Sequence, residues 1–517
     1  MSSRLNVDRA LLWQLAGLGV LAFFFRLVPV LLSGGMQGLV DYDDGVYMAT
    51  SLALVRDRIV YRDFFVIHPP GMFILLTPFA ALSWFVSDAT AWATARGGMM
   101  VLGGLNTVLV GLVAFKVGGR KAAFAAAGLY AVWTTAARVE RSTWLVAPQN
   151  TYLLLSLLAL APTFPGPSSI PVTWRRAAVV GILLGLCGAT QIWGIVPAAV
   201  VGAWLLLRTF RQPGGWIRPV VAYSLAGLAT IVVIFLPFYV IAGEQMLRLV
   251  IFDQIGRSVK GVGITVRLLR MEGMPGALIR FGLGFVSIPI YLATMAAVLY
   301  TAWRRPAIRL FVALFAAQSL FLLTTPTFYS HYAGWIAPVA SLSIGMAAAT
   351  AIDWLARWPR RATLLRAAYG LGLAGFLTAT LVPRLVGFSF ASKHFDPGPV
   401  EAAVADARCP TADNPSLLIL TGTLRRILDN GCPLLVSPTG VSYDTDRSLR
   451  GKDRIRLKMP EYQAAMQAYY GHADAIMFVR DPAARGLNEQ TLAIIRAHLP
   501  VEIERGTVQI LLPSPPP

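Results

Sequence analysis

The chain has 517 residues, of which 56% are hydrophobic and 14% are charged, and its formal net charge is +19. A typical soluble domain carries about 25% charged residues. The composition therefore excludes an ordinary soluble enzyme, a disordered chain and a small disulfide-rich secreted module, and it indicates a helical membrane protein. In such a protein, basic residues gather in the loops that hold helix ends at the cytoplasmic face, so we do not expect nucleic-acid binding.

The apolar segments predict a bundle of membrane-spanning helices. A span needs about 20 mainly apolar residues, and a helix satisfies its own backbone hydrogen bonds in lipid. The run 177–207 is too long for one span and is therefore divided at Thr190-Gln191. We expect about eleven spans, at residues 11–33, 93–115, 122–137, 149–163, 177–190, 191–207, 219–242, 281–303, 307–324, 333–356 and 363–386.

The basic residues predict the direction of each span, because Lys and Arg concentrate on the cytoplasmic side. With a cytoplasmic N-terminus, the basic stretch 116–121 requires residues 34–92 to begin and end outside. The short apolar run 72–87 is then expected not to cross, and either to lie along the outer interface or to dip into it as a re-entrant helix. The alternation ends with an extracytoplasmic C-terminus. We expect a multi-pass plasma-membrane protein whose first helix is an anchor and not a cleaved signal peptide.

Residues 391–517 are more polar and form a predicted second domain after a membrane domain of residues 1–390. Strand-like and helix-like runs alternate in it, which predicts a small extracytoplasmic α/β domain with a disordered Pro-rich end. Cys409 and Cys432 lie there, and either a disulfide or two buried thiols would account for them. The strands are expected at 416–420, 433–437, 475–479 and 508–512, and the helices at 400–408, 461–470 and 489–498.

Polar residues concentrate in the first outer loop. Asp41, Asp43 and Asp44 directly follow a spanning helix, and the motif continues to Tyr47. Carboxylates at the membrane interface are costly to desolvate unless they meet water, a cation or a substrate. A solvated loop with a helix N-cap would explain one of these aspartates, but less easily three. The loop also contains Arg62 and a His68-Pro69-Pro70 sequence before the interfacial helix, which favours a functional site.

Three further outer segments carry unusual polar residues. Glu140 lies in the sequence Arg138-Val139-Glu140-Arg141, which is either part of the site or an interfacial ion pair. Arg257 and Lys260 belong to an outer loop that is basic against the charge rule; they would bind either a lipid-linked phosphate or anionic headgroups. His331 and Tyr332 lie at the outer mouth between two spans, and a lone His is more often structural.

Together these residues suggest a sugar transfer reaction. A sugar carried on a lipid phosphate already has a good leaving group, so no general acid is strictly needed. The acceptor hydroxyl needs a base, which one carboxylate can supply. Glycoside hydrolases differ from this arrangement because they use a carboxylate pair. Cationic side chains would stabilise the departing phosphate.

At this point the sequence resembles the GT-C glycosyltransferases that use polyprenyl-phosphate sugars. This superfamily includes the protein O-mannosyltransferases, the lipid A aminoarabinose transferases and related bacterial cell-envelope enzymes. Their first outer loop bears Asp-Glu-x-x-Tyr followed by Lys/His-Pro-Pro. Here Asp43-Asp44-Gly45-Val46-Tyr47 is similar, with Asp in place of Glu, and His68-Pro69-Pro70 matches the second part. His331-Tyr332, before an apolar span, looks like a later motif of the family. The resemblance covers roughly residues 1–390.

The resemblance implies an inverting transfer to a glycan, lipid or protein acceptor of the cell envelope, on the outer face of the plasma membrane. It makes Asp43 the general base, although the Asp at position 44 leaves Asp44 as the alternative. Asp44 and Tyr47 would support the site, and His68 would lie near the donor phosphate. Glu140 occupies the place of a second acidic residue of the family. The nearest relatives need no metal or other cofactor, so we expect none; a divalent ion bridging Asp43 and Asp44 is the alternative.

Two other function classes compete with this interpretation. A flippase or transporter of lipid-linked sugars would place ionisable groups near the middle of the bilayer and often shows internal repeats. Arg26 is the main charge in mid-span here, and no clear repeat is seen. A non-catalytic glycan-binding membrane protein would tolerate replacement of Asp43. The polar residues gather at the outer ends of the spans, which favours an enzyme. The sequence identifies neither the sugar nor the acceptor.

Overall fold

The structure is a computed structural model, and its chain forms two compact units. Unit 1 comprises Met1–Leu32, Gly97–Val232 and Gly261–Ala391, and unit 2 comprises Ser33–Arg96, Val233–Lys260 and Ser392–Pro517. The chain passes between units near the predicted domain boundary at residue 391 and at four other places. The structure describes residues 8–166, 169–210, 212, 215–256, 262–271, 284–357, 363–364, 367–368, 370, 393–445, 456–479 and 482–515.

Unit 1 is built of helices. Six helices among the described residues are long and apolar enough to cross a membrane, including Arg9–Leu31, Ile217–Ala242 and Ser330–Leu355. The principal helices that contribute residues to this unit are α1 (Arg9–Leu31), α4 (Asp88–Val132), α5 (Thr134–Val139), α6 (Val146–Leu160), α7 (Trp174–Thr190), α8 (Ile195–Phe210), α9 (Ile217–Ala242), α12 (Ile264–Met271), α14 (Gly284–Arg304), α15 (Arg309–Thr324) and α16 (Ala337–Leu355). The expected all-helical membrane bundle is confirmed.

Most of the predicted spans correspond to individual helices, and the largest difference lies in α4. This 45-residue element contains the predicted span 93–115 and most of the predicted span 122–137, and its helical geometry is interrupted at Gly119, whose φ is +76°. A positive φ is accessible to glycine without steric cost, so the chain breaks direction at this residue. The basic stretch 116–121 surrounds the break, as the sequence predicts. The expected span 363–386 lies mostly outside the described residues.

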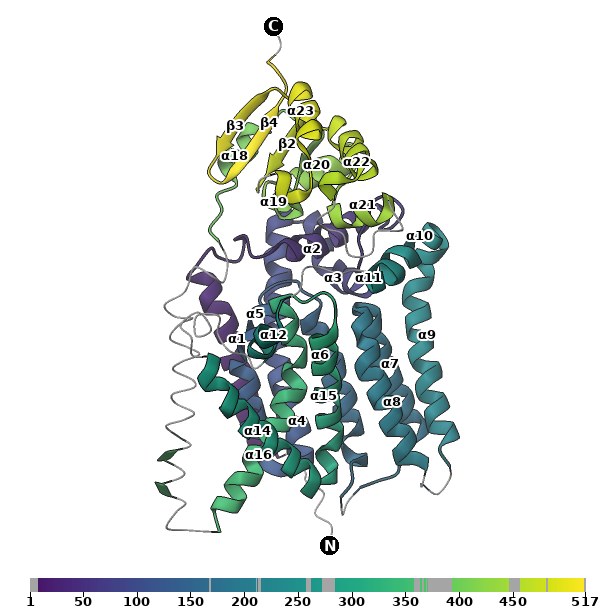
Figure 1. The fold of residues 1–517 in the computed structure, drawn as a ribbon, viewed down its shortest axis with the longest axis vertical. Coiled ribbons are helices and arrows are strands. Elements are labelled where there is room, and N and C mark those ends of the chain that lie inside the picture. The colour runs from purple at the N-terminus through teal and green to yellow at the C-terminus, as the bar shows by residue number, and fades with distance from the viewer. Residues whose placement is uncertain are drawn as a thin grey trace. The chain divides into compact units, whose positions relative to one another are not determined.

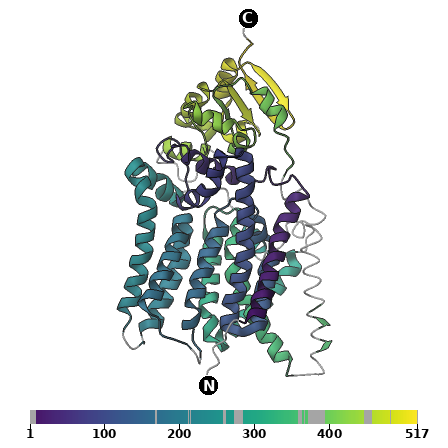
Figure 2. The same ribbon diagram turned by 180° about the vertical axis from the view of Figure 1, so that it is seen from behind.

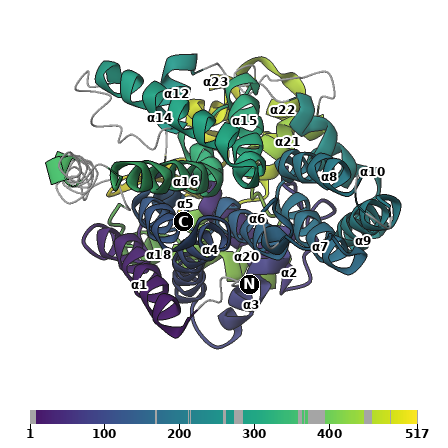
Figure 3. The ribbon, with the colours of Figure 1, turned by 90° about the horizontal axis from the view of Figure 1, so that it is seen from below.

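Small residues allow the helices of unit 1 to approach closely. A Cβ atom added at Gly181 of α7 would lie 3.1 Å from the backbone nitrogen of Gly227 in α9. Figure 3 shows α7, α8 and α9 grouped together. Helix α1 runs beside α4 (Figure 2), where Leu11 and Leu15 pack against Phe115. Because lipid tails are as apolar as Leu, such packing, and not hydrophobic exclusion, holds spanning helices together.

The first outer loop forms short helices of unit 2. They are α2 (Tyr42–Leu54), α3 (Gly71–Ala81) and the 3₁₀ turn η1 (Leu82–Trp84). The 14-residue apolar segment Gly71–Trp84 is shorter than the roughly 17 residues that a span requires. The length of this segment therefore agrees with the prediction that residues 72–87 do not span the membrane. A second part of unit 2 contains α10 (Glu244–Leu247), the π-helical turn η4 (Arg248–Phe252) and α11 (Asp253–Gly256).

The C-terminal segment of unit 2 is a small α/β fold with a four-stranded mixed sheet in the order β1-β2-β4-β3. Strand β1 (Pro410–Ala412) runs parallel to β2 (Ala475–Phe478), whereas β4 (Val508–Leu512) is antiparallel to both β2 and β3 (Val501–Arg505). The strands lie side by side in Figure 1, with α22 (Pro460–Gly471) and α23 (Glu489–His498) beside them. The remaining helices are α18 (Gly398–Ala403), α19 (Pro415–Leu420), α20 (Thr423–Asp429) and α21 (Pro438–Thr445).

Two expected strands of this segment are wrong. Residues 416–420 lie in helix α19, which begins at Pro415 and is capped by Asn414, whose side chain accepts from the amide of Ser416. All six residues of α19 are buried, and a short apolar run buried on every face has no periodicity that separates helix from strand. Residues 433–437 form a loop. The strands expected at 475–479 and 508–512 and the helices expected at 461–470 and 489–498 are confirmed to within a residue.

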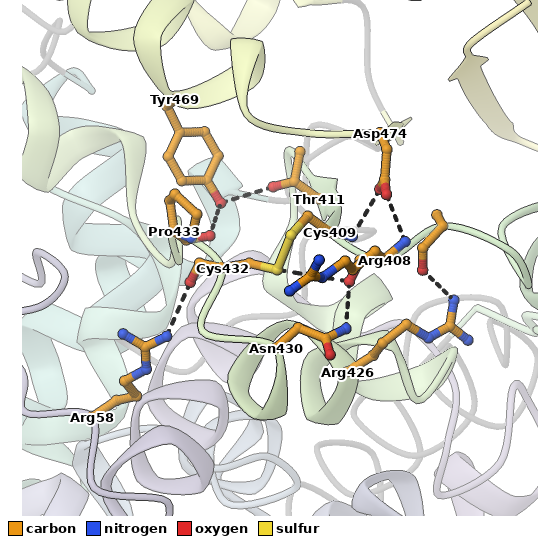
Figure 4. The surroundings of a disulfide bond; sticks show 11 residues. Arg58, Arg408, Cys409, Thr411, Arg426, Asn430, Cys432, Pro433, Tyr469 and Asp474 are labelled. Carbon is orange, nitrogen blue, oxygen red and sulfur yellow. Dashed lines mark hydrogen bonds between the residues drawn. A yellow bond between two sulfur atoms is a disulfide. The ribbon is translucent and has the colours of Figure 1, made fainter.

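Cys409 and Cys432 form a disulfide, which decides between the two alternatives for these residues. The bond joins the start of β1 to the loop after α20 (Figure 4). The carboxylate of Asp474 accepts hydrogen bonds from the backbone amides of Arg408 and Cys409 at 2.6 and 2.8 Å. Arg58 of the first outer loop donates to the carbonyl of Cys432 at 3.2 Å. The bridge is therefore part of the packing between two distant segments of unit 2.

Candidate active site

The predicted site residues are divided between the two units. Asp43, Asp44, Tyr47, Arg62 and His68 belong to unit 2, and Glu140, His331 and Tyr332 belong to unit 1. Arg257 and Lys260 lie outside the described residues.

Asp44 is fully buried and held by an arginine that the sequence did not single out. Its Oδ2 accepts from Nε and Nη2 of Arg96 at 3.0 and 2.7 Å, and its Oδ1 accepts from the indole Nε1 of Trp92 at 3.3 Å. The side chains of both Asp44 and Arg96 have no exposed surface. Arg96 also donates through Nη1 to the carbonyls of Met36 and Gly38. Such a charge-paired, fully bonded carboxylate is suited to holding structure rather than to accepting a proton.

Asp43 is adjacent to Asp44 but has a different environment. It is only partly buried and lies in the first turn of α2. Asp41 caps this helix, since its side chain accepts from the backbone amide of Asp43. The positive end of the helix dipole favours a charged carboxylate in the first turn. Of the two neighbouring aspartates, one is thus fully buried and paired with arginine, and the other is only partly buried.

His68 is fixed on several sides. Its Nε2 lies 3.2 Å from the hydroxyl of Tyr47, one helical turn after Asp43, and the two rings meet edge to face. The hydroxyl of buried Tyr61 donates to the carbonyl of His68, and Gln254 donates to the carbonyl of Ile67. Tyr61 adopts a φ of +73°, which is rare for a residue with a side chain and is often found near functional sites. These contacts place Tyr47 and His68 together, as the motif predicts.

The C-terminal segment contacts the start of α2 directly. A Cβ atom added at Gly45 would lie 2.7 Å from the backbone nitrogen of Ser416 in α19, so only glycine permits this approach. The hydroxyl of Tyr42 donates to the carbonyl of Val436 at 3.1 Å. The guanidinium of Arg485 lies 4.6 Å from the centre of the Tyr42 ring. Burial raises the pKa of Tyr42, so this residue is neutral at physiological pH. Asp43 therefore lies on a helix whose position depends on the C-terminal segment.

Arg485 is itself oriented by a buried carboxylate. Its Nε donates to Oδ2 of Asp413 at 2.8 Å, and the carboxylate of Asp413 has no exposed surface. The other oxygen of Asp413 accepts from the amide of Val479 at 2.8 Å. The chain Asp413–Arg485–Tyr42 thus links the end of the sheet to the residue that precedes Asp43.

Arg62 lies away from the buried contacts of this site. Its side chain is exposed and donates two bonds to the carboxylate of neighbouring Asp63, at 2.7 and 2.8 Å. This pairing lowers the pKa of Asp63. The contacts described for Arg62 do not support its expected role in donor binding, which stays a prediction.

Glu140 forms the centre of a buried polar network in unit 1. Its Oε2 accepts from Nε of Arg26 at 2.8 Å, and its Oε1 accepts from Asn106 at 3.0 Å and from the hydroxyl of Tyr130 at 2.6 Å. The side chains of Arg26 and Glu140 are fully buried. The mid-span charge of Arg26 is therefore neutralised, and both oxygens of Glu140 are occupied by protein donors.

His331 and Tyr332 lie in the 3₁₀ segment η6 (Ser330–Ile336) among aromatic rings. The ring of His331 is 4.6 Å from that of Trp144 and is stacked 5.6 Å from that of Tyr329. Tyr332 is buried and meets Trp193 edge to face at 4.3 Å. Arg138 donates to the hydroxyl of Ser330 at 3.4 Å. The loop after α5 and the segment before α16 therefore form one aromatic and polar cluster in unit 1.

Four residues that hold this site were not predicted from the sequence: Trp92, Arg96, Asp413 and Arg485. Trp92 and Arg96 are spaced by four residues near the start of an apolar helix, and an arginine at the outer end of a predicted span contradicts the charge rule. That exception could have indicated a partner for Asp44. Asp413 and Arg485 show no comparable signal, because they lie about 370 and 440 residues beyond Tyr42 and no motif joins them. Among the described residues, no group of three or more His, Cys, Asp or Glu side chains could hold a metal ion.

Comparison with solved structures identifies the fold. No family model and no curated protein matches the sequence. ArnT from Cupriavidus metallidurans, solved with undecaprenyl phosphate, matches 98% of each chain with a TM-score of 0.52 and 13% identity. The apo oligosaccharyltransferase of Archaeoglobus fulgidus matches 94% of this chain and 73% of its own, with a TM-score of 0.57 and 13% identity. The chain has the GT-C fold. The expected GT-C-like fold is thereby confirmed.

Proposed function

We propose that the protein is a membrane glycosyltransferase that moves a sugar from a polyprenyl-phosphate donor to a cell-envelope acceptor on the outer face of the plasma membrane. The observation that carries the proposal is the division of roles between Asp43 and Asp44. A GT-C fold with one first-loop aspartate that is only partly buried, beside one that is fully buried and bonded to arginine, provides a base and its support. The solved relatives with this fold include ArnT bound to undecaprenyl phosphate and AglB bound to dolichol-phosphate.

In the proposed reaction, Asp43 accepts the proton of the acceptor hydroxyl, whose oxygen attacks the anomeric carbon from the face opposite the phosphate. The bond from the anomeric carbon to the phosphate oxygen breaks, and its electron pair leaves with the polyprenyl phosphate. The configuration of the sugar is inverted. Asp44 holds α2 through Arg96, and Tyr47 orients His68 near the donor phosphate. The proposed reaction needs no metal or other cofactor, because the leaving phosphate needs only cationic groups to stabilise it.

A donor panel tests this proposal. Wild-type protein in nanodiscs is incubated with radiolabelled polyprenyl-phosphate sugars and a cell-envelope extract, and the label in the acceptor is measured with and without EDTA. We expect one donor to be consumed, EDTA to have no effect, and the product to show the anomeric configuration opposite to that of the donor.

The alternative functions predict different outcomes. A transporter of lipid-linked sugars would move donor across the membrane of a proteoliposome without forming a glycoside. A glycan-binding membrane protein would retain glycan without consuming any donor. The donor panel is first validated with a known GT-C enzyme and its own acceptor. If this protein then transports donor or binds glycan but transfers no sugar from any donor of the panel, the transferase proposal is rejected.

A further inference from the structure

A cavity of about 490 Å³ lies between the end of α6 and the start of α7, within unit 1. Its walls include Leu158, Ala159 and Pro162 on the side of α6, and Arg175 and Arg176 on the side of α7. Small-molecule sites usually have volumes of about 300–1,000 Å³. None of these residues takes part in the proposed transfer, so the cavity is a candidate site for a second kind of ligand.

The loop that joins α6 to α7 is fixed by the end of α8. Arg208 donates from Nε to the carbonyl of Thr163 at 3.1 Å and from Nη2 to the hydroxyl of Ser169 at 2.8 Å. The side chain of Gln212 accepts from the amide of Val172 at 2.9 Å and donates to the carbonyl of the same residue at 3.1 Å. Because these bonds hold both ends of the loop, the walls of the cavity do not depend on a ligand.

The basic wall of the cavity favours an anion. Arg175 and Arg176 lie in the first turn of α7, which contains no acidic residue. The first turn is the positive end of the helix dipole, where an anion is stabilised and a cation is not. Arg176 is partly buried, and its Nη1 is buried without a hydrogen-bond partner among the described residues. A bound oxyanion would accept from this guanidinium and neutralise the first turn.

The surface of α7 beside the cavity is apolar. Val179, which lines the cavity, and Ile182, about one turn further along, are 48% and 44% exposed. Trp174 is exposed, and the guanidinium of Arg175 lies 5.4 Å from the centre of its ring. Tryptophan is enriched in membrane proteins at the depth of the lipid headgroups. An occupant should therefore combine an anionic head for the arginines with an apolar part for Val179 and Ile182.

We propose that this cavity binds the headgroup phosphate of an anionic glycerophospholipid, whose acyl chains lie along the exposed apolar side of α7. The basic residues predict that this end of α7 faces the cytoplasm, so the lipid would come from the inner leaflet. The alternative is a general attraction between basic loops and an anionic membrane, in which Arg176 would act like any exposed basic residue. The cavity and the buried Nη1 of Arg176 favour a specific site. This inference does not depend on the proposed function.

A titration with a short-chain lipid tests the site. The full chain is purified in a neutral detergent, and the rise in its melting temperature is measured against the concentration of dioctanoyl phosphatidylglycerol. We expect Arg176→Gln to weaken the apparent affinity about 10-fold or more, because hydrogen bonds to a charged group are lost. The matched control is Arg304→Gln, which changes an exposed arginine that also lies beside an exposed tryptophan, Trp303, but does not line this cavity. It should bind like wild type.

A second variant keeps the test decisive if Arg176→Gln does not fold. Arg175 is exposed, so Arg175→Gln should leave the melting temperature of the lipid-free protein almost unchanged. We expect it to weaken binding of phosphatidylglycerol about 3-fold, less than Arg176→Gln because an exposed charge contributes less. Wild-type affinity in folded Arg175→Gln would overturn the proposal.

Other ligands separate the possible sources of the phosphate. Dioctanoyl phosphatidylcholine and inorganic phosphate, at the same concentrations, should protect the protein much less than phosphatidylglycerol. Equal protection by phosphatidylcholine would show that the apolar surface alone binds lipid. Equal protection by inorganic phosphate, lost in Arg176→Gln, would make the cavity a site for a soluble phosphate. An equal loss of binding in Arg304→Gln and Arg176→Gln would show a general attraction to the basic face. Each of these three results would overturn the proposal.

Discussion

Asp43 and Asp44 are neighbours in sequence, yet burial and pairing give them different chemistry. The carboxylate of Asp44 meets Arg96 and Trp92 in a site closed to solvent, whereas Asp43 is partly exposed at the start of α2. A base must reach the substrate, and Asp44 is fully buried and already bonded to Arg96 and Trp92. The sequence leaves open whether Asp43 or Asp44 is the general base, and we therefore propose Asp43.

Replacing Asp44 should damage the fold before it damages the chemistry. Asp44→Asn leaves the guanidinium of Arg96 buried without its counter-charge, and breaking a buried ion pair in this way costs about 3–5 kcal/mol. We expect a large fall in the melting temperature of the purified protein. The matched control is Asp353→Asn, which removes exposed pairs with Lys121 and Arg305 and should cost no more than about 1 kcal/mol for each pair. A melt unchanged from wild type in Asp44→Asn would show that the ion pair does not support the fold.

At the scale of elements, the approach of α19 to α2 decides where Asp43 lies. Gly45 is the residue that permits this contact, because a methyl group there would collide with the backbone of Ser416. The C-terminal segment thus acts on the site through packing, and through the Tyr42–Arg485 contact.

Gly45→Ala should shift α2 and reduce both stability and transfer. Overpacking of a tight contact typically costs about 1–3 kcal/mol, and alanine otherwise favours a helix over glycine. Gly471→Ala is the control, because a Cβ atom there has open space around it. The measurements are the melting temperature and the rate of transfer. If Gly45→Ala is as stable and as active as Gly471→Ala, the contact with α19 does not position the site.

The helices of the bundle were predictable because their apolar length is a strong signal, and α23 was predictable from its amphipathic pattern. The pairing of Asp44 with Arg96 was only hinted at by a basic residue on the wrong side of the membrane. Strands β1 and β3 were missed: β1 is three residues long, and the burial of β3 alternates only weakly. The contact of Arg485 with Tyr42 joins residues more than 400 positions apart, which no local pattern encodes.

At the scale of the whole molecule, the basic loops predict a cytoplasmic N-terminus and an extracytoplasmic C-terminal segment. The Cys409–Cys432 disulfide agrees with an oxidising compartment for that segment. Cysteine labelling in intact cells checks this orientation. A membrane-impermeant maleimide should label Gln490→Cys but not Arg304→Cys until the cells are opened; both positions are exposed, and the free thiol of Cys187 is buried. The reverse pattern would place the proposed site in the cytoplasm.

The central claim is that Asp43 removes the proton from the acceptor during transfer from a polyprenyl-phosphate sugar. The most direct test is the single-turnover rate of transfer by purified Asp43→Asn, compared with wild type on the donor that the panel identifies. General-base catalysis contributes about 10²–10⁴-fold, so we expect a loss of at least 100-fold, with an unchanged melting temperature and unchanged binding of undecaprenyl phosphate. Transfer by Asp43→Asn at the wild-type rate would contradict the account.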